Sequence, residues 1–318
     1  LTATFPGNAI DIRSHSNDGS RYIVQVSSDV DPGTFYLYDK SANTIKALFK
    51  YYPNIDSTQL AKQEPIEYQS SDGLTIHGYF TQAKNATADK PAPLIMMVHG
   101  GPHARDDWGY SRQIQFLALN GYSVMQVNFR GSTGYGSDFQ DAGLKNWGTA
   151  IQRDIYEGVQ WAINNKLASA DKVCIMGASF GGYSALQNII KYPDTYQCSI
   201  ANAGVYDLPL MFEEGDVPTR TYGNSYLEMT LGTDKQALIQ NSPNYHASKV
   251  NTPLFLAHGK RDERAPFTHA ERLRDALEEA GKKYEWYVVK NEAHGFYDPE
   301  NQKEYMNRVL KFLDTHLN

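Results

Sequence analysis

Ser179 stands at the centre of the segment Gly177–Gly181, which follows a short apolar run at Val173–Met176 and precedes a helical pattern. A Gly-x-Ser-x-Gly sequence between a buried strand and a helix folds into a turn so tight that only small residues fit two positions before and after the serine. The turn strains the serine backbone and brings the hydroxyl close to the positive end of the helix dipole. A glycine-rich turn with a surface serine is the alternative. The context favours a nucleophile, so we predict that Ser179 is one.

A serine hydroxyl is a weak nucleophile without a general base, and in folds built around this turn an acid and then a histidine follow the serine along the chain. His294 lies in the loop Asn291–Phe296, between the last predicted strand and the last predicted helix. Such a loop lies at the carboxyl edge of the sheet, where α/β proteins form their sites. We therefore predict that His294 is the base rather than a loop histidine that caps the last helix.

Two aspartates at the ends of predicted strands are candidates for the acid that orients the base. Asp262 follows the strand Leu254–Ala257, and Asp207 follows Ser199–Ala201. Asp262 is nearer to His294 along the chain and lies between a strand and a helix, so we predict that Asp262 is the acid. The alternative is that Asp262 caps the following helix or is a surface carboxylate. Asp207 is expected to cap the segment that comes after it.

The turn His99–Pro102 follows the predicted strand Leu94–Val98 and contains two consecutive glycines. A tetrahedral intermediate needs preorganised N–H donors for its oxygen, and removing one donor typically costs about 10²–10³ in rate. Glycine lets the backbone approach a ligand closely. We predict that the oxyanion donors are the N–H groups of Gly101 and of Phe180, the residue after the nucleophile.

No metal or cofactor is predicted. His99 and His103 are four residues apart, but a metal-binding pair at this spacing needs a helix, which Gly-Gly-Pro between them would break. The glycine-rich segment Asn128–Gly136 lacks the Gly-Lys-Ser/Thr ending of a phosphate-binding loop, so we expect it to line the cleft.

Buried strands alternate with helices through most of the chain, which predicts a mostly parallel sheet with helices on both faces. A hairpin at Ile66–Gln69 and Leu74–Phe80 precedes this region. The expected strands are Leu94–Val98, Ser123–Asn128, Val173–Met176, Ser199–Ala201, Leu254–Ala257 and Trp286–Val289. The expected helices lie near Ser111–Leu119, Ala150–Asn164, Gly181–Lys191, Thr268–Ala280 and Gln302–His316. The segment Asp207–Gln240 interrupts the alternation and is predicted to be an insertion that covers the site.

The first fifty residues have a different pattern, in which short strands are separated by turn residues. The runs Ala9–Arg13, Tyr22–Ser27, Thr34–Tyr38 and Thr44–Phe49 predict one four-stranded antiparallel meander. We therefore divide the chain into residues 1–64, the meander with its linker, and residues 65–318, the α/β domain.

Composition excludes several classes of function. The 318 residues carry 30 Lys and Arg against 36 Asp and Glu, a net charge of −6, with no basic stripe, so a nucleic acid is not an expected partner. The apolar run Leu94–Val98 is far too short to cross a membrane, so no membrane association is expected.

The two cysteines, Cys174 and Cys198, lie on consecutive predicted strands on either side of the nucleophile helix. Consecutive strands of this type are often neighbours, so a disulfide is geometrically feasible, and two buried free thiols are the alternative. A bridge would place the protein in an oxidising compartment, periplasmic or secreted, whereas free thiols fit the cytoplasm.

Five motifs in this order resemble the prolyl oligopeptidase family of serine peptidases, in its branch of acylaminoacyl-peptidase and dipeptidyl-peptidase-5-like enzymes. The match extends from about Pro65 to the end of the chain. The motifs are His99–Pro102, Asn128–Gly136, Gly177–Tyr183, His258–Pro266 and His294–Phe296.

The resemblance implies an α/β-hydrolase fold in which Ser179, Asp262 and His294 form the triad, with Gly101 and Phe180 as oxyanion donors. Arg264 matches an arginine that holds a substrate carbonyl in this family, although its sequence context alone indicates a surface charge or a salt bridge. Many relatives carry tyrosine at the position of Phe180, a difference that leaves the backbone donor unchanged.

The resemblance also implies the activity, a peptidase that cleaves short or N-blocked peptides through an acyl-enzyme. A carboxylesterase with the same triad is the alternative, because acyl chemistry does not itself choose between amide and ester. A non-catalytic binding module is a third interpretation, which the intact triad disfavours.

Members of this family carry a β-propeller ahead of the hydrolase domain, and the N-terminal meander resembles its last blade. We therefore expect a C-terminal region of a longer protein or a truncated relative. A lone blade leaves apolar faces uncovered, because such units need neighbours. The blade is expected to pack on another chain, as in a homo-oligomer, or on the hydrolase domain.

Overall fold

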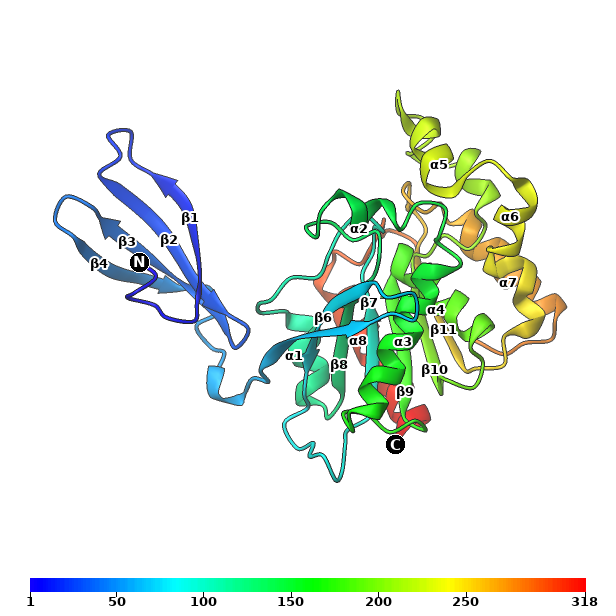
Figure 1. The fold of residues 1–318 in the computed structure, drawn as a ribbon, viewed down its shortest axis with the longest axis horizontal. Coiled ribbons are helices and arrows are strands. Elements are labelled where there is room, and N and C mark those ends of the chain that lie inside the picture. The colour runs from blue at the N-terminus through cyan, green and yellow to red at the C-terminus, as the bar shows by residue number, and fades with distance from the viewer.

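Two separate β-sheets organise the chain, and the computed structural model describes residues 1–318 (Figure 1). The first sheet pairs its strands antiparallel in chain order and forms the blade predicted from the sequence. On β2 the alternating residues Val24 and Val26 are buried, as the period of two predicts. The blade consists of β1 (Ala9–His15), β2 (Arg21–Ser28), β3 (Asp31–Asp39) and β4 (Thr44–Lys50).

The second sheet has eight strands in the order β12-β11-β10-β9-β7-β8-β6-β5. The six strands from β12 to β8 are parallel, and the hairpin β5–β6 adds antiparallel to the edge at β8. The mostly parallel sheet and its hairpin are therefore confirmed. The strands are β5 (Gln63–Gln69), β6 (Thr75–Thr81), β7 (Leu94–Val98), β8 (Ser123–Asn128), β9 (Val173–Ala178), β10 (Cys198–Asn202), β11 (Leu254–Gly259) and β12 (Glu285–Val289).

Helices cover both faces of this sheet, because successive strand residues point to opposite sides. Ile95 packs with α1 and α8, whereas the next residue, Met96, faces the core formed with α3, α4 and α7. The covering helices are α1 (Arg112–Leu119), α3 (Ala150–Asn164), α4 (Phe180–Lys191), α7 (Thr268–Glu279) and α8 (Pro299–Leu317). No helix is long and apolar enough to span a membrane.

The inserted segment contains helices that the sequence analysis did not predict. Glycine and proline residues recur along the segment, so no run with the periodicity of a helix is long enough to be recognised in the sequence. Asp234 caps one of these helices by accepting from the backbone N–H of Gln236. The additional elements are α5 (Gly223–Leu231), α6 (Lys235–Gln240) and α2 (Ser137–Asp141), with 3₁₀ turns at Ser57–Gln59, Pro209–Phe212 and Pro243–Lys249.

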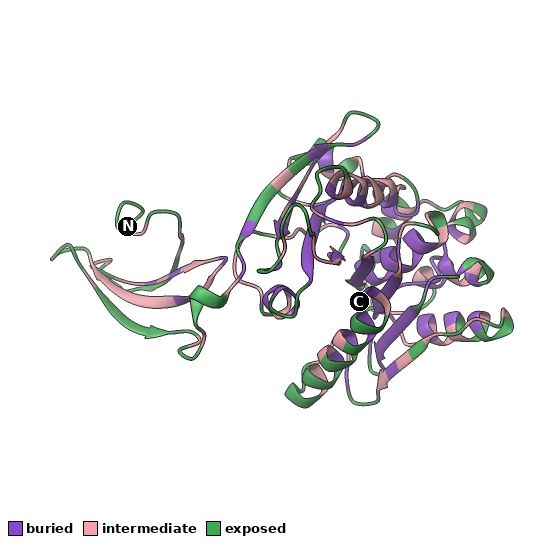
Figure 2. Cartoon of the chain, turned by 90° about the horizontal axis from the view of Figure 1, so that it is seen from below, coloured by how far each residue is buried: buried purple, intermediate pink, exposed green.

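The blade projects from the side of the eight-stranded sheet and is mostly exposed or half-buried (Figure 2). Its contact with the α/β part of the chain includes Asp29, whose carboxylate accepts from the backbone N–H of Gln63 at 2.7 Å. The backbone carbonyl of Asp29 also accepts from the side chain of Gln115 on α1 at 3.1 Å. The division of the chain at residue 64 remains a prediction, and β5 begins at Gln63.

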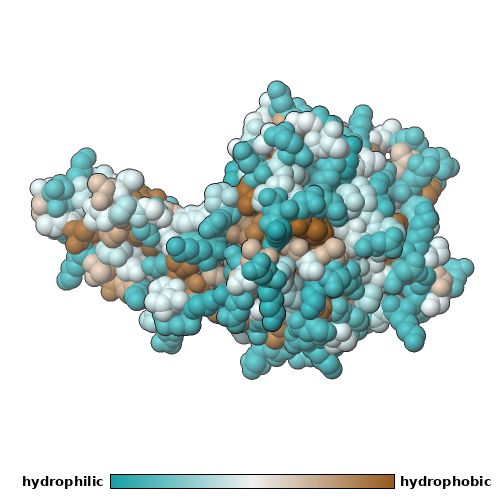
Figure 3. All heavy atoms as spheres, turned by 60° about the horizontal axis from the view of Figure 1, so that its bottom comes forward, coloured by the Kyte–Doolittle hydropathy of each residue, from teal (hydrophilic) through white to brown (hydrophobic).

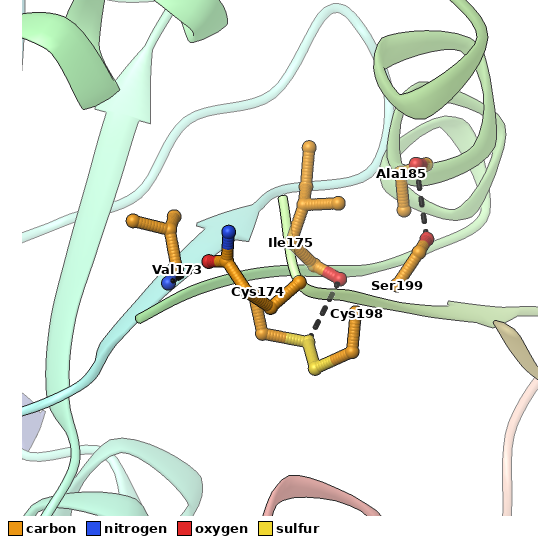
Figure 4. The surroundings of a disulfide bond; sticks show 7 residues. Val173, Cys174, Ile175, Ala185, Cys198 and Ser199 are labelled. Atoms are coloured by element: carbon orange, nitrogen blue, oxygen red, sulfur yellow. Dashed lines mark hydrogen bonds between the residues drawn. A yellow bond between two sulfur atoms is a disulfide. The ribbon is translucent and has the colours of Figure 1, made fainter. Parts of the chain in front are cut away.

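Cys174 and Cys198 lie directly opposite each other on the parallel strands β9 and β10, with their Cα atoms 4.7 Å apart. Their sulfur atoms are joined beneath the sheet, on the face covered by α1 and α8 (Figure 4). Both side chains are fully buried, so the bridge lies within the hydrophobic core.

We predict that the denatured, unreduced chain contains no titratable thiol and that reduction exposes two. Because the bridge joins residues 24 positions apart, its loss should lower the free energy of unfolding by about 3 kcal/mol. Thiol titration in denaturant measures the first quantity, and urea unfolding with and without reductant measures the second. The Cys198→Ala variant is the control, with one thiol under both conditions. Two thiols in the unreduced chain would contradict the bridge.

Candidate active site

Ser179 connects β9 to α4 with a backbone φ of 58° and ψ of −121°, a conformation that is costly for a residue with a side chain. Its backbone N–H donates to the carbonyl of Asn202 on β10 at 2.9 Å. A Cβ on Gly177 would lie 2.4 Å from the carbonyl of Gly181, and one on Gly181 would lie 2.0 Å from the carbonyl of Val98. The neighbouring backbones are therefore too close for any residue but glycine at these two positions.

His294 and Asp262 are joined by a hydrogen bond of 2.7 Å between Nδ1 and Oδ2. His294 comes from the loop after β12, and Asp262 from the loop after β11. The two loops are in close contact, because the N–H of Arg261 donates to the carbonyl of Glu292 at 2.8 Å. A Cβ on Gly259 would lie 2.2 Å from the carbonyl of Ala293, so the contact requires glycine there.

Asp262 is a fully buried carboxylate with hydrogen bonds to both oxygens. Its Oδ1 accepts from the N–H groups of Arg264 at 2.9 Å and Ala265 at 2.8 Å. Burial raises the pKa of Asp262, but hydrogen bonds from His258, His294 and Ala265 outweigh burial and hold that pKa well below its usual range. The carboxylate is therefore ionised at neutral pH, as an acid that orients a histidine must be.

A cleft of about 590 Å³ brings the predicted residues together at the carboxyl edge of the sheet. Ser179, His294 and Gly101 all line it, and the His294 side chain is 29% exposed to it. Arg264 also lines the cleft, where its guanidinium pairs with Asp216 at 2.7 Å. Asp262 lies behind His294 and supports it from the protein side.

The predicted oxyanion donors have free N–H groups. Gly101 makes no hydrogen bond through its backbone N–H. Phe180 is the first residue of α4, where an N–H has no acceptor within the helix. Its ring is buried and packs edge-on against Trp147, with 4.9 Å between centroids. The aromatic side chain therefore lies in the core, and Phe180 offers its backbone to the site.

The sequence analysis assigned no individual role to three residues near the triad. His258 is buried, with Nε2 2.8 Å from the carbonyl of Ala265 and 3.3 Å from Asp262 Oδ2. Glu292 is buried two residues before His294 and accepts from the N–H groups of Tyr297 and Asp298, both at 2.9 Å. Asp216, in the insertion, holds Arg264. The place of His258 in the motif His258–Pro266 and that of Glu292 two residues before His294 were the available signals of such a role.

The alternatives considered from the sequence occupy other positions. Asp207 pairs with Arg272 at 2.7 Å and accepts from the N–H of Leu210, so it caps the first turn of the insertion. His99 and His103 bind separate partners, the hydroxyl of Ser132 and the carbonyl of Gly131. No three His, Cys, Asp or Glu side chains of the chain are grouped so that they could hold a metal ion.

The parallel sheet covered on both faces and the strained serine turn at its carboxyl edge define an α/β-hydrolase. The chain belongs to the prolyl oligopeptidase family, whose model matches residues 108–318. It is 34% identical to dipeptidyl aminopeptidase BIII from Pseudoxanthomonas mexicana, over 98% of this chain and 47% of that protein. It is 30% identical to acylamino-acid-releasing enzyme 1 from Oryza sativa subsp. japonica, over 71% of this chain and 30% of that protein.

Solved structures share the fold of nearly the whole chain, including the blade. A puromycin-hydrolysing peptidase from Mycobacterium tuberculosis superposes with a TM-score of 0.85 at 22% identity, over 94% of this chain and 46% of that one. An acylaminoacyl peptidase from Pyrococcus horikoshii superposes with a TM-score of 0.83 at 23% identity, over 96% and 49%. The chain thus spans about half the length of these proteins and of dipeptidyl aminopeptidase BIII.

We predict that the contribution of His269 to the stability of the fold is lost as the pH falls below about 6.5. Burial lowers the pKa of His269 to about 3, whereas an unfolded histidine binds its proton near pH 6.5. Between these values the unfolded chain holds the extra proton, so this stabilisation is complete above about pH 6.5 and declines below it by about 1.4 kcal/mol per pH unit. Urea unfolding between pH 7.5 and 4.5 measures the slope.

The His269→Asn variant tests the assignment, because its amide oxygen can still accept from the N–H of Asp207 but does not titrate. It should show a shallower dependence on pH, whereas His15→Asn, at an exposed position in the blade, should keep the wild-type slope. Equal slopes in His269→Asn and the wild type would contradict the role of His269.

Proposed function

We propose that this chain is a serine peptidase that cleaves short or N-blocked peptides through the triad Ser179, His294 and Asp262. The observation that carries the proposal is the 2.7 Å hydrogen bond that Nδ1 of His294 donates to the ionised Asp262, in a cleft that His294 shares with Ser179. Asp262 thereby keeps the proton on Nδ1 and leaves Nε2 free to act as a base.

In the proposed reaction the Ser179 hydroxyl oxygen attacks the carbonyl carbon of the substrate while His294 takes the hydroxyl proton. The carbonyl oxygen becomes an oxyanion held by the N–H groups of Gly101 and Phe180. When the C–N bond breaks, His294 gives its proton to the leaving amine. Water, activated by the same histidine, then hydrolyses the serine ester and releases the carboxylic acid product.

The position of Arg264 supports a role for this residue in binding the peptide, because Arg264 lines the same cleft as Ser179. The Arg264 side chain is 47% exposed and pairs with Asp216. The backbone N–H of Asp216 donates to the carbonyl of Glu263 at 2.8 Å, which connects Asp216 to the loop that carries Asp262. We propose that the guanidinium holds a substrate carbonyl. The relatives named for dipeptide and acylamino-acid release favour a peptide substrate.

Hydrolysis of an aminoacyl nitroanilide beside a nitrophenyl ester of the same acyl group separates the candidate activities. A peptidase turns over both, a carboxylesterase turns over the ester alone, and a binding module turns over neither. Reaction with a fluorophosphonate, read by mass spectrometry, reports whether Ser179 is activated at all.

We predict that Ser179→Ala abolishes fluorophosphonate labelling, because the variant has no nucleophile. Asp262→Asn should lower kcat by about 10⁴, since an amide favours the wrong histidine tautomer. Asp207→Asn is the matched control, a buried aspartate that contacts Arg272 and should leave kcat within about threefold of the wild type. Labelling of Ser179→Ala, or equal losses in the two asparagine variants, would refute the triad.

We propose that the blade binds a second copy of this chain. Apolar side chains are exposed on both edge strands, Ile12 on β1 at 55% and Phe49 on β4 at 59%, with Leu48 beside it at 43%. Figure 3 shows apolar atoms on the blade surface between polar ones. Exposed apolar area of this kind is stabilised by burial against a partner.

Sedimentation velocity should therefore detect a concentration-dependent oligomer of the 318-residue chain. Phe49→Lys should weaken association at least about tenfold, because it places a charge where the apolar contact forms. Lys166→Glu, a charge change at an exposed turn of the hydrolase domain, is the control and should associate like the wild type. A chain that remains monomeric at high concentration would rule out the proposed contact.

We also propose that the protein works in an oxidising compartment, periplasmic or extracellular. The proposal is supported by the paired positions of Cys174 and Cys198 on adjacent strands, because disulfides persist where thiols are not kept reduced. Thiol titration, described with the fold, tests it.

A further inference from the structure

A second cavity, of about 700 Å³, lies between the N-terminal halves of α1 and α8 at the carboxyl end of β10. This volume is within the range of about 300–1,000 Å³ that is typical of small-molecule sites. None of the residues that line the cavity also lines the cleft of Ser179. The cavity is therefore a place for a ligand other than the group that reacts with the serine.

Asn202, the last residue of β10, lines the cavity with its side chain. Alternate residues of a strand share a face, so Asn202 points to the same side as Ile200, which packs with α1 and α8. The Asn202 side chain is 8% exposed, and its Oδ1 is buried without a hydrogen-bond partner. Buried polar groups in folded proteins are normally paired, so this amide lacks a partner that a ligand in the cavity could supply.

The chemical group that pairs best with this amide is another amide. A half-turn about the last side-chain bond of Asn202 exchanges its oxygen and its nitrogen, so the side chain can offer the cavity an acceptor or a donor. An amide of a ligand has both a C=O and an N–H, and it can therefore pair with either orientation of Asn202.

The two charged residues that line the cavity are both cations, Arg112 at the start of α1 and Lys303 on α8. No carboxylate lines the cavity. Gln113 is the second residue of α1, where a backbone N–H has no acceptor within the helix. Asp298, which caps α8, is occupied by two backbone N–H groups of that helix. Positive charge beside an unpaired N–H favours a carboxylate as ligand.

Apolar side chains from three elements complete the wall of the cavity. Phe116 of α1, Phe296 of the loop after β12 and Met306 of α8 are half-buried there, and Tyr305 beside them is buried. Aromatic rings supply large apolar contact areas, and a methionine side chain adapts to ligands of different shape. The cavity thus combines cations, an unpaired amide and an apolar wall.

We propose that this cavity binds a small organic acid that has an amide and an apolar side chain, that is, an N-acylated amino acid with a free carboxylate. Arg112 and Lys303 hold the carboxylate, Asn202 pairs with the amide, and the side chain packs on Phe116 and Phe296. The inference goes beyond the proposed peptidase function and does not depend on it, because binding at this site needs no catalysis.

Calorimetric titration with N-acetyl-L-phenylalanine tests the site. The matched ligand is N-acetyl-L-phenylalaninamide, which keeps the amide and the ring but has no carboxylate. We expect the acid to bind with a Kd below about 1 mM and the amide to bind at least about tenfold more weakly. Equal affinity for the two ligands would contradict a carboxylate site.

Charge variants on the two helices locate the bound acid. Arg112→Gln and Lys303→Gln should each weaken binding at least about fivefold, because each removes a cation from the cavity. Lys311→Gln is the matched control, an exposed lysine further along α8 that does not line the cavity, and it should bind like the wild type. Arg264→Gln, in the cleft of Ser179, should also keep the affinity of the wild type.

Asn202→Leu tests the role of the amide, since leucine has a similar branched shape without polar atoms. This variant should lose at least about tenfold in affinity and stay folded at the temperature of the titration, because the fold loses no hydrogen bond of the amide oxygen. The inference is overturned if the acid does not bind the wild type at about 10 mM, if Lys303→Gln and Lys311→Gln weaken binding equally, if Arg264→Gln alone abolishes it, or if Asn202→Leu binds like the wild type. Failure of the peptidase proposal is seen separately, as a wild-type chain that does not react with a fluorophosphonate.

Discussion

The hydrogen bond between the Asp262 carboxylate and Nδ1 of His294 lies where the loops after β11 and β12 meet. A buried carboxylate without partners would cost several kcal/mol, so its two oxygens must find donors. Two of these donors are the backbone N–H groups of Arg264 and Ala265, in the same loop as Asp262. The other two are the side chains of His258, at the end of β11, and His294, in the loop after β12. The hydrogen bonds to the Asp262 carboxylate therefore fix the loop that carries Asp262, orient His294 and place Arg264 at the cleft. The ionised state that orients His294 is a consequence of the same four contacts.

The nucleophile depends on a second constraint, the close approach of three backbones. Glycine at 177 and 181 lets the ends of β9 and β7 and the start of α4 come within contact distances that a Cβ would prevent. The unfavourable backbone conformation of Ser179 persists because this packing and the bond to the Asn202 carbonyl hold it in place. The hydrophobic cores on both faces of the sheet stabilise the strands that carry these turns. The stability of the domain therefore compensates for the unfavourable backbone conformation of Ser179.

Most of the hydrolase domain could be predicted because its signals are local. Helix α3 spans the predicted residues Ala150–Asn164, and β7 and β8 also match their predicted bounds, since apolar runs of strand length between turn residues leave little choice. The helices of the insertion could not be predicted, because short helices such as α5 and α6 depend on tertiary contacts more than on propensity. Glu292 and Asp216 were missed for a related reason, since a carboxylate in a loop has the same sequence signature whether it is buried or exposed.

By itself the sequence determined the order of elements, the serine turn, the family and which residues were candidates for the triad, because each depends on residue type and spacing along the chain. The tertiary structure decided what those residues face. It separated Asp262, which binds His294, from Asp207, which binds Arg272, and it turned the His99 ring towards the Gly100 carbonyl and Ser132. These contacts form between residues that are far apart in the sequence and lie on different loops and strands. The packing of the whole sheet determines such contacts, and no local sequence pattern encodes them.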